Sequence, residues 1–109
     1  MLSFSQLEFF LAPPLPEKPA GRDAALEAVA RHLLGRQGAA ALAMRVQVEW
    51  SARLRTAAGR AESRSARILL NRRLSAHGAR EIDQTLRHEL AHLLAQFRST
   101  RRRVPPHGG

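Results

Sequence analysis

The feature that most constrains the fold is a stripe of apolar side chains near the end of the chain. Six of them recur at helical spacing between Glu81 and Phe97: Ile82, Leu86, Leu90, Leu93, Leu94 and Phe97. Such a stripe covers one side of an α-helix and has to be buried against another layer. We therefore expect a long amphipathic helix over residues 81–97 that packs on the rest of the domain.

The first twenty residues differ in composition from the rest of the chain. Four prolines fall between Pro13 and Pro19, a pattern that resists regular structure. Residues 1–20 are therefore interpreted as a proline-rich lead-in, and the folded domain is expected to occupy residues 21–109. Asp23 is a good N-cap residue, and the apolar side chains after it recur at helical spacing until Gly35, which predicts a first helix.

A period of two follows the first helix. Val46, Val48 and Trp50 alternate with polar residues, which is typical of a half-buried strand. The segment Arg60 to Asn71 contains a second apolar run, and we expect it to pair with the first strand as an antiparallel hairpin. The sequence thus predicts an α+β fold in which an N-terminal helix and a small antiparallel sheet pack on the long C-terminal helix.

Composition narrows the kinds of chemistry available to this chain of 109 residues. Because it contains no cysteine, any metal must be held by histidine, aspartate or glutamate. No stretch approaches the roughly 20 apolar residues that span a bilayer, so no membrane partner and a cytoplasmic location are expected. The formal net charge of +9 makes nucleic acid a candidate partner through a basic surface, although a solvated surface explains the charge equally well.

The long predicted helix contains the motif His88-Glu89-Leu90-Ala91-His92. On a helical wheel the two histidines lie away from the apolar stripe and one turn apart, so their imidazoles can converge on one metal ion. Glu89 lies beside them, where a carboxylate can take a proton from water. The spacing predicts a zinc site, with two surface histidines on an exposed helix as the alternative.

A catalytic zinc site usually has three protein ligands. A third histidine ten residues after His88 is excluded because that position is Arg98, and a downstream glutamate is excluded because residues 93–109 contain no acidic residue. His107 is the remaining downstream candidate.

Several ordered segments resemble the SprT-like family of zinc metalloproteases over Val46 to Gly109. They are Val48-Glu49-Trp50, Arg53-Leu54, Ala58 to Ala61, Arg67 to Asn71, Thr85 to His92 and Pro106-His107-Gly108. The resemblance implies a zincin-like, minigluzincin-like domain with one catalytic zinc ion, bound by His88, His92 and His107, and with Glu89 as general base. It also implies hydrolysis of protein substrates, with a stress-related or DNA-associated role. Because family members usually continue beyond Pro-His-Gly, the resemblance leaves three alternatives for this chain: a product truncated at the C-terminus, a fragment, or a minimal domain.

Two other functions stay open from the sequence. The fold is equally compatible with a basic module that binds nucleic acid, or with an inactive remnant that has an idle metal site. In the peptidase hypothesis, we expect the strand around Val46 to Trp50 to receive an extended substrate at the edge of the sheet.

Overall fold

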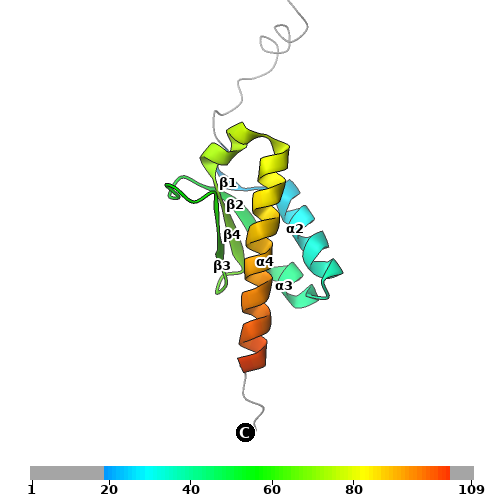
Figure 1. Cartoon of the computed structure of the whole chain (residues 1–109). Helices are drawn as coiled ribbons and strands as arrows, with labels where there is room; N and C mark the ends of the chain where they lie inside the picture. Colours follow the sequence, from blue (N-terminus) through cyan, green and yellow to red (C-terminus); the bar gives the residue numbers. More distant parts are fainter. Residues whose placement is uncertain (1–18, 104–109) are drawn as a thin grey trace, which may run out of the picture.

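The computed structural model describes residues 19–103, with side chains up to Thr100 (Figure 1). Its elements in chain order are β1 (Gly21–Arg22), α2 (Ala24–Arg36), α3 (Ala40–Arg45), β2 (Gln47–Ser51), β3 (Gly59–Glu62), β4 (Arg67–Asn71), the 3₁₀ helix η1 (Arg72–His77) and α4 (Ala79–Arg103). The predicted α+β class is confirmed. The lead-in over residues 1–20 lies almost entirely outside the described residues, so the domain boundary stays a prediction.

The sheet is mixed, with strand order β1-β2-β4-β3. β2 and β4 are parallel, in the register Val48 opposite Ile68, whereas β3 and β4 are antiparallel. The predicted antiparallel hairpin between Val46–Trp50 and Arg60–Asn71 is therefore wrong. The second segment is itself the hairpin, because it reverses direction at Ala66, where φ is 53° and the backbone is left-handed.

The same arrangement corrects the predicted substrate edge. β2 is flanked by β4 on one side and by β1 on the other, with Gly21 opposite Trp50. Its backbone groups are thus largely used within the sheet. The strand at the edge of the sheet beside α4 is β3.

The core lies between the sheet and the helices α2 and α4, which pack on one of its faces (Figure 1). Alternate residues of the two inner strands point into it, as period-two alternation requires: Val48, Trp50, Ile68 and Leu70. From α4, Leu86, Leu90 and Leu93 are buried and the other three residues of the apolar stripe are partly buried. The long-helix prediction is confirmed. No helix among the described residues is both long and apolar enough to cross a membrane.

The first helix is confirmed and begins at the predicted cap, because the Asp23 carboxylate accepts a hydrogen bond from the Leu26 N–H at 3.0 Å. The same carboxylate accepts a bond from the indole Nε1 of Trp50 at 3.0 Å. Trp50 is thereby fixed in the core. The short helix α3 was not predicted.

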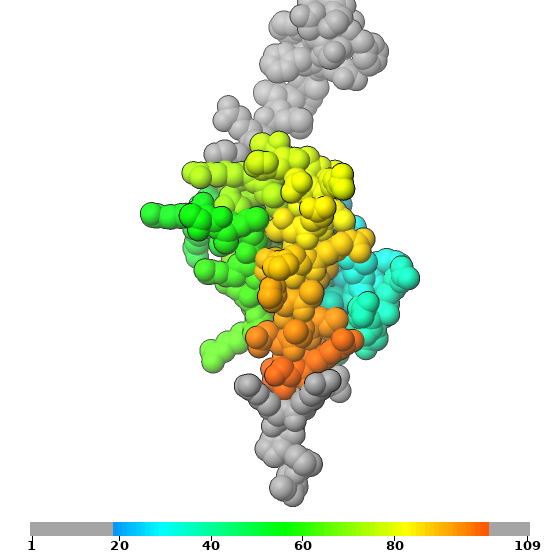
Figure 2. All heavy atoms as spheres, in the orientation of Figure 1, coloured from blue at the N-terminus to red at the C-terminus, as the bar shows by residue number. Residues whose placement is uncertain are grey.

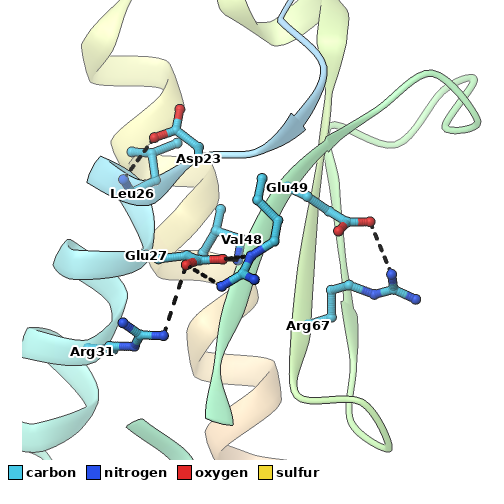
Figure 3. Close-up of polar contacts among 8 residues, drawn as sticks. Asp23, Leu26, Glu27, Arg31, Val48, Glu49 and Arg67 are labelled. Carbon is cyan, nitrogen blue, oxygen red and sulfur yellow. Dashed lines mark hydrogen bonds and ion pairs between the residues drawn. The ribbon is translucent and has the colours of Figure 1, made fainter. Parts of the chain in front are cut away.

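Glu27 is a buried carboxylate that joins α2 to the first two strands (Figure 3). Its two oxygens accept bonds from the Arg22 guanidinium at 2.7 and 2.8 Å, and one of them also accepts the Val48 N–H at 3.1 Å. The bond from Arg22 lowers the pKa of Glu27, against the opposing effect of burial. The carboxylate is therefore charged in the folded domain and holds three elements together.

We predict that Glu27→Gln lowers the free energy of unfolding by about 2 kcal/mol at neutral pH, because the partly buried bond from Arg22 no longer has a charged acceptor. The folded-state pKa is lowered, so the contribution of the carboxylate is complete above the ordinary glutamate pKa. It is lost as pH falls through the folded-state pKa. Urea unfolding of both proteins between pH 7 and pH 3 should show the difference shrinking in acid. A difference that stays constant over this range would contradict the assignment.

Candidate active site

Helix α4 presents the two motif histidines on its exposed side, one turn apart. The Nε2 atoms of His88 and His92 are 3.1 Å apart. Their ring centroids are separated by 4.6 Å, and the rings meet edge to face at 82°. The i, i+4 spacing therefore brings the two imidazoles together, and both direct the Nε2 atom toward the same point.

The histidine pair fits a shared zinc ion. With Zn–N bonds of 2.0–2.1 Å and tetrahedral angles, two imidazole nitrogens on one zinc lie roughly 3.3 Å apart. The observed separation of Nε2 atoms is close to this value. In the absence of metal the same separation suits a hydrogen bond in which one ring donates and the other accepts. Two imidazoles are also the donor type that zinc prefers.

The structure does not bring a third ligand to this pair within its described part. Among the described residues, no group of three histidine, cysteine, aspartate or glutamate side chains is placed to hold a metal ion. His32 on α2 and His77 at the end of η1 are both exposed and belong to no such group. The predicted ligand His107 lies outside the described residues, and its role stays a prediction.

Glu89 lies on the side of α4 that faces β3 and is only 9% exposed. No hydrogen bond or ion pair to its carboxylate is formed by any residue that the structure describes. Its burial depends on Gly59, because a Cβ atom there would lie 3.0 Å from Glu89 Cγ. Glu89 is thus packed against the edge strand beside His88, and within residues 19–100 its carboxylate has no partner.

A shallow hollow of about 360 Å³ opens at this point between α4 and the start of β3. Its lining consists of Ala57, Ala58, Gly59, Gln84, Thr85, His88 and Glu89. A larger hollow of about 560 Å³ lies between α2 and α4 and touches neither motif histidine nor Glu89. The smaller hollow therefore gives a ligand access to His88 and Glu89.

Asn71 fixes the wall of the smaller hollow. Its side-chain amide donates to the carbonyls of Leu54 and Ala57 at 3.1 and 3.0 Å, and its backbone N–H donates to Ala58 at 2.8 Å. The amide oxygen accepts the N–H of Arg73, which caps η1. Sequence reasoning missed this residue. Its only local signal is an asparagine at the end of an apolar strand, which predicts the cap and not the bonds to a distant loop.

Together these features define a small α+β domain with a histidine pair and a glutamate on its longest helix. In comparisons with known proteins, the SprT-like family model matches residues 26–109. The chain therefore belongs to the SprT-like family. No curated protein and no solved structure matched it.

We predict that Gly59→Ala destabilises the domain by about 1–2 kcal/mol, as overpacking usually does. The added methyl group would meet Glu89 Cγ and Thr85 Cγ2 at 3.0 Å and the Leu69 carbonyl at 3.2 Å. The matched control is Gly35→Ala in α2, where nothing lies within 4 Å. That change should stabilise the helix by roughly 0.5–1 kcal/mol. Urea unfolding measures both, and a Gly59→Ala protein as stable as the parent would refute close packing here.

Proposed function

We propose that this protein is a zinc-dependent metallopeptidase that hydrolyses protein substrates. The observation that supports this most directly is the convergence of the His88 and His92 Nε2 atoms, 3.1 Å apart, next to Glu89, whose carboxylate has no partner in the described part of the chain. Membership of the SprT-like family agrees with such an activity. A structural role for the histidines does not explain why the buried Glu89 beside them lacks a partner among the described residues, because burying such a group is costly.

In this proposal His88, His92 and His107 hold the zinc ion. When bound, zinc would supply Lewis-acid polarisation of a substrate carbonyl and lower the pKa of a water molecule. Glu89 accepts the proton of the attacking water and later donates it to the departing amine, as a general base and then a general acid. Glu89 lines the same hollow as His88, and its Cγ packs against Gly59.

The substrate is proposed to lie along β3. This strand forms an edge of the sheet and begins at Gly59, which lines the hollow beside Glu89. An extended peptide can pair with the free backbone groups of such an edge. β3 thus takes the role that we had expected of the strand around Val46 to Trp50. A DNA-associated role and a cytoplasmic location remain predictions.

The zinc site is tested by the metal content of the purified full chain. We expect about one zinc ion per chain and a sharp loss of zinc in His88→Ala, His92→Ala and His107→Ala. His32→Ala is the matched control and should keep its zinc, because His32 lies on α2 as an exposed side chain. Elemental mass spectrometry gives the stoichiometry. A parent protein that holds no zinc after reconstitution contradicts the proposal.

The role of Glu89 is tested separately by Glu89→Gln. This variant should keep its zinc but lose at least roughly a hundredfold in peptidase rate, because the amide cannot accept the proton. Cleavage of fluorescein-labelled casein measures the rate. The control is Glu81→Gln, an exposed residue in the first turn of the same helix, which should retain the parent rate.

The same two proteins distinguish the competing functions. A parent without peptidase activity, together with salt-dependent binding of DNA by Glu89→Gln, would instead favour the nucleic-acid module. Absence of zinc, cleavage and DNA binding would indicate the inactive remnant.

A further inference from the structure

The stretch from Ser51 to Ala61 is basic and unneutralised. It contains Arg53, Arg55 and Arg60 and no acidic residue. All three arginines are exposed. In the described part of the chain, their guanidinium groups form no hydrogen bond or ion pair. This differs from Arg22, which is bound to Glu27, and from other arginines that have a carboxylate partner.

Two carboxylates on neighbouring strands already have an arginine partner. Arg67 on β4 binds both Glu49 of β2 and Glu62 of β3, each at 3.1 Å. Glu62 is the residue of β3 closest in sequence to Arg60 that carries a negative charge. One guanidinium therefore serves both carboxylates, and among the described residues neither of them forms an ion pair with Arg60.

The same stretch forms one wall of the hollow at the motif. Ala57, Ala58 and Gly59 line it together with His88 and Glu89. The loop between β2 and β3 projects from the body of the molecule, to the left in Figures 1 and 2. A ligand that enters the hollow along β3 therefore passes the loop that carries two of the free arginines.

The alternation of β3 places Arg60 for contact with such a ligand. A side chain at Gly59 would point toward α4. Because successive residues of a strand alternate, Arg60 points to the opposite face of the sheet. A peptide paired with the edge of β3 would direct alternate side chains to that same face. Opposite charges on neighbouring strands stabilise pairing, and like charges oppose it.

From this arrangement we infer that the site selects peptide segments rich in acidic side chains, through Arg53, Arg55 and Arg60. The inference rests on the proposed peptidase function, because it names the substrate of that site. A peptide is favoured over single-stranded nucleic acid because residues 51–61 contain no aromatic side chain on which bases could stack. Trp50 is no substitute, since it is buried and hydrogen-bonded to Asp23.

The test measures binding to the full-length Glu89→Gln protein by fluorescence anisotropy. The probes are a fluorescein-labelled peptide with glutamate at alternate positions and a matched peptide with glutamine there. We expect the acidic peptide to bind roughly five- to tenfold more tightly, as a few exposed ion pairs allow. The change Arg53→Gln, Arg55→Gln and Arg60→Gln together should remove most of this preference.

The control combines Arg31→Gln, Arg36→Gln and Arg45→Gln, which remove the same charge from α2 and α3. Figure 1 shows these helices on the other side of α4 from β3. The control should keep the preference for the acidic peptide. An equal loss in both triple variants, or no preference in the first place, overturns the inference. The inference is also overturned if binding of single-stranded DNA depends on Arg53, Arg55 and Arg60 and binding of the acidic peptide does not.

Failure of the peptidase proposal gives a different result. Binding is measured on the Glu89→Gln protein and needs no turnover, whereas cleavage is measured on the parent. A parent that cleaves nothing, with the acidic preference intact, rejects the peptidase and leaves a surface for acidic peptides. A parent that cleaves casein, without any acidic preference, rejects only the inference.

Discussion

The close approach of β3 to α4 at Gly59 is the contact on which the candidate site depends. Without a side chain at this position, the edge strand reaches the helix surface and covers Glu89, whose Cγ lies where a Cβ of residue 59 would nearly touch it. The same contact places the start of β3 beside His88. Glu89, His88 and the start of the edge strand therefore lie around one hollow.

The surrounding fold supports this contact from both sides. Asn71 binds the loop before β3 through Leu54 and Ala57, so the strand begins at a fixed place. At the opposite edge of the sheet from β3, Glu27 connects α2 to Arg22 of β1 and to the backbone of Val48 in β2. Two buried polar side chains thus connect segments that are distant in sequence. Buried polar groups with several bonds restrict the arrangement more strictly than apolar packing does.

The two principal helices could be predicted because their side chains carry the signal locally. Asp23 marks the start of α2, and the stripe that includes Leu86 and Leu93 marks α4. α3 was missed because its alanine-rich sequence between Ala40 and Arg45 has no such stripe. The pairing of β2 with β4 was predicted in the wrong direction, because alternation indicates which residues are buried and not which strand lies next to them.

The candidate site also has a part that could be predicted from local sequence and a part that could not. His88 and His92 could be brought together from the sequence, since a single helix turn sets their distance. The surroundings of Glu89 could not, because they depend on Gly59, Asn71 and the order of the strands. Non-local contacts of this kind are not encoded in the spacing of neighbouring residues.

The two halves of the candidate site also differ in how much of the chain their geometry involves. One turn of α4 sets the separation of the His88 and His92 Nε2 atoms. The packing around Glu89 needs Gly59 of β3, which pairs with β4, and β4 in turn lies parallel to β2. A substitution in the sheet can therefore change the surroundings of the carboxylate while it leaves the histidine pair intact.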